Sequence, residues 1–212
     1  MPAESAAKRA VCARCLRAQS ACICQWITPL QSHVELLILQ HPLEVGNAKN
    51  SARLLHLSVQ PSTMVVGETF DAAVLQTLLE EGGRTPVLLY PDTPGDQSLG
   101  IAPPPALDPR VLDAPGALRL VIVDATWRKS RKMLYVNPIL QTLPRFTLRA
   151  MPPSHYTIRK AHAPDQLSTL EAGVHAMMQM DAEPLRWQGL LDAFDGFVAQ
   201  QSRWTEGKGQ CR

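Results

Sequence analysis

The sequence lacks the signatures of several large protein classes. No run approaches the roughly 18 apolar residues that a membrane-spanning helix needs, and the first residues contain no apolar segment typical of a secretory signal. No strand is followed by G-x-G-x-x-G, and G-x-x-x-x-G-K-[ST] is absent, which argues against a dinucleotide-binding Rossmann site and a P-loop. The net charge of +2 favours neither the presence nor the absence of a nucleic-acid partner. We therefore expect a cytoplasmic protein with no membrane partner.

Length and composition favour one domain with a true core. The chain has 212 residues, of which 45% are apolar, so there is room for a single domain and a small appendage. Many of the 18 prolines fall in the stretch 91–115, together with several glycines. This composition predicts a long irregular connection there.

Four of the five cysteines lie close together near the N-terminus, in the pattern C-x2-C-x6-C-x-C: Cys12, Cys15, Cys22 and Cys24. A disulfide framework does not suit a reducing cytosol, whereas four neighbouring thiolates suit a tetrahedral zinc ion. Four protein ligands leave no open position for a catalytic water, so we predict a structural Zn2+ site. Redox-active or unliganded thiols are the alternatives. We predict a four-cysteine zinc-binding module over residues 1–30 and a larger domain over residues 31–212.

The rest of the chain alternates between short apolar runs and helical patterns. We predict strands over 33–40, 64–67, 86–90, 118–123 and 145–149. We predict helices over 47–57, over 71–81, from 127, after 165 and from 184. Such alternation indicates an α/β fold, with a mainly parallel sheet and helices on both faces.

The stretch 118–132 combines a buried strand with a candidate functional site. The apolar run stops on Asp124, and Thr126, Trp127 and a basic segment follow. The carboxyl end of a buried strand is where open α/β sheets place their ligands. The alternative is that Asp124 or Thr126 only caps the helix that begins near Trp127. The residues alone leave both interpretations open.

Two further segments carry charge near predicted helix starts. The loop after the first strand contains His41 and Glu44, and the helix behind it begins with polar and basic residues, a usual place for anion or ligand binding. His41 and Glu44 alternatively only shape the turn. Arg128, Arg131 and Lys132 share one face of the helix after Trp127. These cations either contact a phosphate backbone or form a solvated face.

Six motifs together resemble the DTW-domain family, the tRNA-uridine aminocarboxypropyltransferases related to the SPOUT class of knotted RNA-modifying enzymes. The motif D-x-T-W that names the family stands at 124–127, and the cysteine pattern precedes it. The other four are H-P-x-E at 41–44, L-Y-P at 89–91, Y-x-I-R at 156–159 and S-T-x-E-A at 168–172. One variation is Asn50-Ser51-Ala52, where the family often has Asn-Thr-Gly.

This resemblance implies a SPOUT-like, trefoil-knotted catalytic domain and a specific reaction. S-adenosylmethionine would donate a 3-amino-3-carboxypropyl group to N3 of a uridine in tRNA. Asp124 and Trp127 would be the catalytic residues. The donor would be bound by these two and by Ser51, Leu89, Tyr90, Pro91, Thr126, Tyr156, Ile158, Arg159, Ser168, Thr169 and Glu171. The candidates for RNA contacts are Lys49, Arg53, Arg128, Arg131 and Lys132.

Two rival functions remain at this point. A SPOUT-type RNA methyltransferase would use the same fold and the same donor but transfer the methyl carbon. A zinc-containing RNA-binding module without catalysis would use Asp124 only as a cap. The sequence does not distinguish a monomer from a homodimer.

Overall fold

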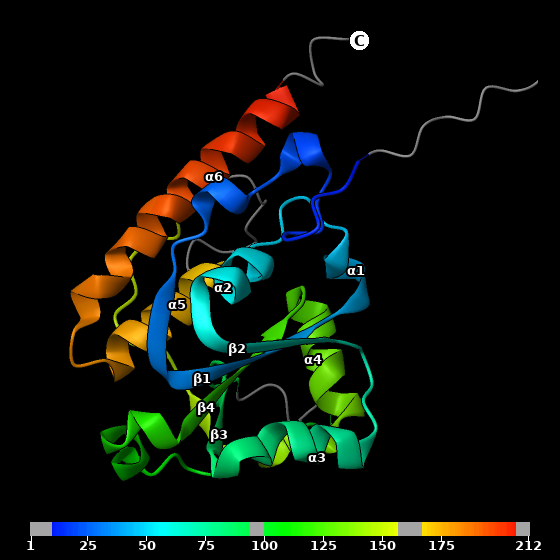
Figure 1. Cartoon of the computed structure of the whole chain (residues 1–212). Coiled ribbons are helices and arrows are strands. Elements are labelled where there is room, and N and C mark those ends of the chain that lie inside the picture. The colour runs from blue at the N-terminus through cyan, green and yellow to red at the C-terminus, as the bar shows by residue number, and fades with distance from the viewer. Residues whose placement is uncertain (1–9, 94–99, 157–166, 207–212) are drawn as a thin grey trace, which may run out of the picture.

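The structure, a computed structural model, describes residues 10–93, 100–156 and 167–206. Its centre is a sheet of five parallel strands in the order β2-β1-β4-β3-β5 (Figure 1). The strands are β1 (Leu30–Gln40), β2 (Val59–Val66), β3 (Thr85–Leu89), β4 (Leu118–Asp124) and β5 (Arg145–Phe146). The predicted α/β fold with a mainly parallel sheet is confirmed.

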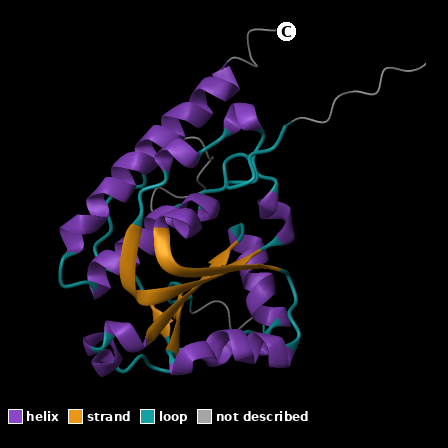
Figure 2. Ribbon diagram, in the orientation of Figure 1, coloured by secondary structure: helices purple, strands orange, loops and turns teal. Residues whose placement is uncertain are grey.

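Helices cover both faces of this sheet, as predicted (Figure 2). The α-helices are α1 (Pro42–Val45), α2 (Ala52–Ser58), α3 (Ala72–Glu80), α4 (Trp127–Val136), α5 (Thr169–Met180) and α6 (Gln188–Glu206). The 3-10 turns are Gln19–Ala21, Cys24–Trp26, Glu81–Gly83, Pro109–Asp113, Pro115–Ala117, Pro138–Thr142 and Pro184–Trp187.

Alternation along the central strands decides which helix packs on which face. Leu36 and Ile38 of β1 share one hydrophobic cluster with α2, α5 and α6, whereas Leu37 and Leu39 share a second cluster with α3 and α4. Successive side chains of a strand point to opposite faces, so β1 is buried on both sides. We call these the α5 face and the α4 face.

Three predicted elements differ from those observed. Only α2 lies within the predicted helix 47–57, and a turn precedes it, because the side chains of Asn47 and Asn50 accept hydrogen bonds from the backbone of Lys49 and Arg53. Strand β2 begins at Val59, before Pro61, which is compatible with a strand at the edge of the sheet. The strand predicted over 145–149 is only the two-residue β5.

Two helix ends lie at residues that commonly bound helices. Asp71 caps α3 by accepting hydrogen bonds from the backbone of Ala73 and Val74, and α4 ends where Asn137 precedes Pro138. Within the described ranges, no helix has the length and apolar character needed to cross a membrane. The trefoil knot and the relationship to SPOUT enzymes stay predictions.

The N-terminal cysteine segment packs against the main body of the protein. Cys15 and Ile23 are buried in the same cluster as α5 and α6, and the indole of Trp26 lies directly against the backbone of α6 at Gly196. The division at residue 30 stays a prediction, although these contacts tie the two predicted parts into one core.

Candidate functional site

Asp124 is a buried carboxylate at the carboxyl end of the sheet that accepts hydrogen bonds from three other elements. It is 3% exposed and ends β4, directly beside Gln40 at the end of β1. Gln40 Nε2 and Asn50 Nδ2 both donate to Asp124 Oδ2, at 2.8 and 2.6 Å. The Thr169 hydroxyl, at the first residue of α5, donates to Oδ1 at 2.7 Å. We call these four residues the Asp124 cluster.

The contacts of Asp124 are not those of a helix cap. Thr126 occupies the N-cap position of α4, and its side chain makes no capping hydrogen bond. The carboxylate of Asp124 instead joins β4 to β1, to the loop before α2 and to α5. Burial raises the pKa of Asp124 above its ordinary value, against the opposing effect of the three donors. The site therefore holds a carboxylate whose charge is costly unless these donors stay in place.

Trp127 belongs to a second group, which contains one more motif residue, Tyr90. Its indole stacks on the Tyr90 ring with centroids 5.3 Å apart and an angle of 14° between the planes. The guanidinium of Arg145 lies 5.1 Å from the same Tyr90 ring, and the Tyr90 hydroxyl lies 3.1 Å from Ser130 Oγ. Tyr90 is buried, whereas Trp127 is 42% exposed. The stack therefore offers one open aromatic surface on a fixed support.

The structure places these two groups on different sides of the sheet. Tyr90 lies in the cluster of the α4 face, whereas Asp124 is bonded to α5 and to the loop before α2. Leu89, next in the chain to Tyr90, is in the cluster of the α5 face, and Pro91 is exposed. The predicted donor-binding residues thus lie on both faces of the sheet, around the carboxyl ends of β3 and β4.

The start of α5 is held by a capping box. Ser168 Oγ accepts a hydrogen bond from the Glu171 backbone, and the Glu171 carboxylate accepts one from the Ser168 backbone. Glu171 also accepts hydrogen bonds from the Ser154 hydroxyl and the His155 backbone. Ser51 Oγ accepts a hydrogen bond from the Leu170 backbone at 3.1 Å. The hydroxyl at position 51 therefore links the starts of α2 and α5.

Tyr156 lies on the same side as the Asp124 cluster. Its ring packs against Phe194 of α6, with centroids 5.5 Å apart, and its hydroxyl donates to the carbonyl of Lys49. The other two predicted residues of this motif, Ile158 and Arg159, lie outside the described residues.

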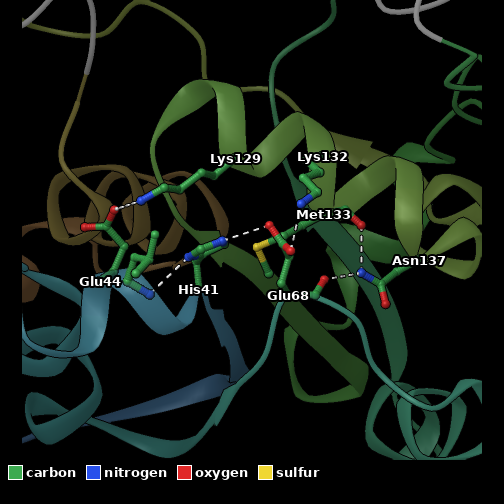
Figure 3. Close-up of polar contacts among 8 residues, drawn as sticks. His41, Glu44, Glu68, Lys129, Lys132, Met133 and Asn137 are labelled. Atoms are coloured by element: carbon green, nitrogen blue, oxygen red, sulfur yellow. Dashed lines mark hydrogen bonds and ion pairs between the residues drawn. The ribbon is translucent and has the colours of Figure 1, made fainter.

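A network of charged groups links the loop after β1 to α4 (Figure 3). His41 Nδ1 accepts from the Leu43 backbone, so a neutral His41 carries its proton on Nε2 and donates it to Glu68, 3.0 Å away. Lys132 contacts the other oxygen of Glu68 at 2.9 Å. Lys129 lies 3.5 Å from the buried carboxylate of Glu44. His41 and Glu44 therefore do more than shape a turn, because both connect to side chains of other elements.

The five predicted RNA contacts fall into two groups. Lys49 and Arg53 lie around the start of α2, on the α5 face. Arg128, Arg131 and Lys132 lie on α4, where Arg128 is exposed and Lys132 is paired with Glu68. A phosphate at Lys132 would have to compete with this carboxylate.

The four cysteines meet at one point. Their sulfur atoms all lie within 4.8 Å of one another, with Cys12 and Cys24 3.6 Å apart and Cys15 and Cys22 3.8 Å apart. A zinc tetrahedron with bonds of about 2.3 Å has sulfur–sulfur edges of about 3.8 Å, whereas a disulfide requires about 2.05 Å. The residues present therefore fit a four-coordinate metal ion.

The thiols of this cluster differ in acidity. Backbone hydrogen bonds, led by that of Cys15, lower the pKa of Cys12 to about 6, whereas burial raises the pKa of Cys24 to about 12. A neutral-pH solution would leave Cys24 protonated in the absence of a cation. Binding of a metal ion would thus release at least one proton.

The match to known proteins covers nearly the whole described chain. Residues 9–202 match the DTW domain. The chain belongs to the DTW-domain family. The aspartate of the D-x-T-W motif, Asp124, is the centre of the Asp124 cluster. The tryptophan of the motif, Trp127, forms the open face of the aromatic stack.

Relatives of this DTW-domain protein carry names that indicate an activity. It is 29% identical over 185 residues to tRNA-uridine aminocarboxypropyltransferase 2 of Mus musculus, covering 84% of this chain and 58% of the mouse protein. It is 29% identical over 192 residues to the protein of that name from Drosophila melanogaster, covering 87% of this chain and 72% of the fly protein. The chain thus spans less than two thirds of the mouse relative. No solved structure matches it.

Sequence reasoning missed several members of the DTW-domain site. Gln40 directly follows the apolar run 36–39 of β1, and its role follows only from the register that places it beside Asp124. Asn50 was noted only as a variation in a motif, although a buried asparagine (8% exposed) needs partners. The pairing of Glu68 with His41 and of Arg145 with Tyr90 joins distant parts of the sequence, and no local pattern indicates it.

Proposed function

We propose that this protein modifies tRNA by transferring the 3-amino-3-carboxypropyl group of S-adenosylmethionine to N3 of a uridine. The observation that carries the proposal is the D-x-T-W geometry: a buried carboxylate held by three donors, three residues before an exposed indole stacked on a buried tyrosine. The names of the relatives supply the substrate and the transferred group. A cytoplasmic location accompanies the proposal.

In this reaction the uridine N3 forms a bond to the aminocarboxypropyl carbon, and the bond from that carbon to the sulfonium sulfur breaks. The electron pair of the broken bond stays on sulfur, so methylthioadenosine leaves uncharged, and the N3 proton passes to solvent. All three carbons on a sulfonium are electrophilic, so the site must select one of them by orientation.

Asp124 contributes orientation and charge in this scheme. Both of its oxygens already accept hydrogen bonds, so it is poorly placed to remove the N3 proton. Its negative charge lowers the energy of a nearby sulfonium. Its bonds to Asn50 and Thr169 hold the loop before α2 and the start of α5 in place around the carboxylate.

The aromatic stack supplies a different interaction. The exposed face of Trp127 suits a cationic or planar group, since an indole attracts cations and stacks on nucleobases. Tyr90 fixes the indole plane from below, and Ser130 holds the Tyr90 hydroxyl. The pair thus forms a surface against which the adenine, the sulfonium or the acceptor base is positioned.

A zinc ion held by Cys12, Cys15, Cys22 and Cys24 would serve as a structural centre. With four thiolate ligands it offers no open coordination site. Its contribution is to fix the fold of the N-terminal segment, which otherwise has few buried apolar residues.

The test is a nucleoside analysis. Purified full-length protein is incubated with unmodified tRNA and S-adenosylmethionine, and the tRNA is digested and analysed by mass spectrometry. We expect aminocarboxypropyl-uridine in the RNA and methylthioadenosine in solution. Asp113→Asn, which removes an exposed carboxylate elsewhere, serves as the matched control for Asp124→Asn.

Two results would contradict the proposal. S-adenosylhomocysteine together with a methylated base would indicate a methyltransferase that breaks a different bond of the sulfonium. Tight tRNA binding with no modified nucleoside, under conditions where S-adenosylmethionine remains intact, would indicate a binding module.

A further inference from the structure

One arginine of the cysteine segment reaches the loop that supports Asp124. Arg17 lies between Cys15 and Cys22 in the sequence. Its Nη1 donates to the carbonyl of Ala48 at 2.5 Å, and its Nη2 donates to the carbonyl of Asn50 at 2.6 Å. The guanidinium therefore bridges two backbone positions that lie more than thirty residues away in the chain.

The loop that Arg17 contacts is held largely by side chains from elsewhere. Its three successive carbonyls accept hydrogen bonds from Arg17, from the hydroxyl of Tyr156 and again from Arg17, at Ala48, Lys49 and Asn50. No helix or strand includes these residues. One backbone hydrogen bond closes the turn that ends at Asn50. The Asn47 side chain also accepts from the Lys49 backbone. Because carbonyls that lie outside helices and strands need partners, the three carbonyls at 48–50 depend on the outside donors.

The position of this loop matters because its last residue enters the Asp124 cluster. The carbonyl of Asn50 accepts from Arg17 on one side, while its side-chain amide donates to Asp124 Oδ2 at 2.6 Å on the other. A shift of the backbone at this residue would move the amide away from the carboxylate. One residue thus connects the cysteine segment to the carboxylate of D-x-T-W.

Arg17 is itself firmly seated. Its guanidinium lies 5.2 Å from the ring of Phe197 in α6. The surrounding segment is anchored on the same helix, since Gln200 Nε2 donates to the Cys22 carbonyl at 3.1 Å and Trp26 Nε1 donates to Gln200 Oε1. The metal-binding segment, α6 and the Asn50 loop therefore form one continuous support.

We propose that Arg17 is a positioning residue, through which the cysteine module sets Asn50 against Asp124 and so orients the donor site. The module then acts on catalysis as well as on folding. The expected change in kcat/KM rests on the proposed transfer reaction. The position of the Asn50 side chain, in contrast, can be measured whether or not that reaction occurs. The planar, forked guanidinium matches two separate carbonyls better than a lysine ammonium does, so we expect lysine to replace arginine only in part.

The experiment compares Arg17→Ala and Arg17→Lys with Arg14→Ala. Arg14 lies in the same module, and its side chain is exposed. We expect full zinc content in all three variants. We expect kcat/KM of Arg17→Ala to fall roughly 10- to 100-fold, the order of loss that a displacement of about 1 Å in a reactive site produces. Arg17→Lys should recover part of this loss, and Arg14→Ala should match the wild type.

The second readout is the side-chain amide signal of Asn50, in protein labelled with 15N-asparagine and assigned with Asn50→Ser. The signal should shift in Arg17→Ala and not in Arg14→Ala, whether or not the wild type shows transferase activity. If the wild type is active and Arg17→Ala retains its kcat/KM with an unmoved signal, Arg17 has no positioning role. If Arg17→Ala does not fold, the same two measurements on Arg17→Lys decide the matter.

Discussion

Replacing Asp124 by asparagine and by alanine separates the charge of this residue from its hydrogen bonds. Asparagine has nearly the same shape. Its carbonyl oxygen, placed where Oδ2 stands, accepts from Gln40 and Asn50, and its amide donates to Thr169, whose hydroxyl is able to reverse. Asparagine therefore keeps all three hydrogen bonds and removes only the charge. Alanine removes both the charge and the three hydrogen bonds.

The two variants should differ strongly in stability. In Asp124→Ala, Gln40 keeps its contact with Asn50 Oδ1, whereas the donors of Asn50 and Thr169 lose their partner. Each buried donor left unsatisfied costs about 1–3 kcal/mol, and removal of a poorly solvated carboxylate offsets part of this. We expect a net loss of about 2–4 kcal/mol for alanine, or about 5–15 °C in Tm for a domain of this size. For asparagine we expect a change within about 1 kcal/mol.

The two variants should not differ in enzymatic activity as they differ in stability. Both variants lack the negative charge, so both should fail to form aminocarboxypropyl-uridine in the nucleoside assay, although Asp124→Asn is folded. Wild-type product formation by Asp124→Asn would refute the role of the charge. A loss of stability in Asp124→Asn as large as that in Asp124→Ala would refute the reversal of the Thr169 hydrogen bond.

The pH dependence of stability gives an independent check. Burial raises the pKa of Asp124 in the folded protein above its ordinary value of 3.8. Between these two pKa values the folded state binds more protons than the unfolded state, so this residue lowers the free energy of unfolding as pH rises. Asp124→Asn lacks this effect. In urea titrations its stability should therefore improve relative to the wild type as pH rises from 3.8, and a constant difference would contradict the cause assigned to the shift.

Three further predictions concern the other parts of the site. Trp127→Ala should lower kcat/KM at least tenfold while changing the free energy of unfolding by less than about 1.5 kcal/mol, since the indole is 42% exposed; an unaltered KM for both substrates would argue against the stack as a binding surface. Gly196→Ala should lower Tm, because a Cβ there would overlap the indole of Trp26, and Trp26→Ala in the same chain should relieve that overlap but not restore full stability. Chelation of the metal should release about one equivalent of zinc, measured with a colorimetric indicator, and should lower Tm; a metal-free protein of unchanged Tm would contradict the structural role of the ion.

Most of the strands and helices could be predicted from the sequence because the central strands are apolar on both faces. Periodicity predicted the alternation of strands and helices, since this signal acts over a few residues. The predictions failed where tertiary contacts decide the local structure. Asn50 ends a turn instead of entering a helix, and the edge strand β2 runs through Pro61 because β1 pairs with it.

The sequence indicated candidate residues for the site but not how they are arranged. The motifs indicated one common site, whereas the structure places their residues on two faces of the sheet. Which strand lies beside which depends on crossover connections, and the neighbour of Asp124 is Gln40 only because β4 inserts between β1 and β3. The connection from Arg17 to Asn50 depends on how the cysteine segment docks, which no periodicity encodes.

The two edges of the sheet bear on how copies of this chain associate. An exposed edge strand with free N–H and C=O groups invites pairing with a second sheet. Here β2 carries Pro61, which has no N–H to donate, and β5 has only two residues. Neither edge offers a long ladder for a strand from another molecule. A homodimer of this chain would therefore join through its helices and loops, and its interface would leave the five-stranded sheet unextended.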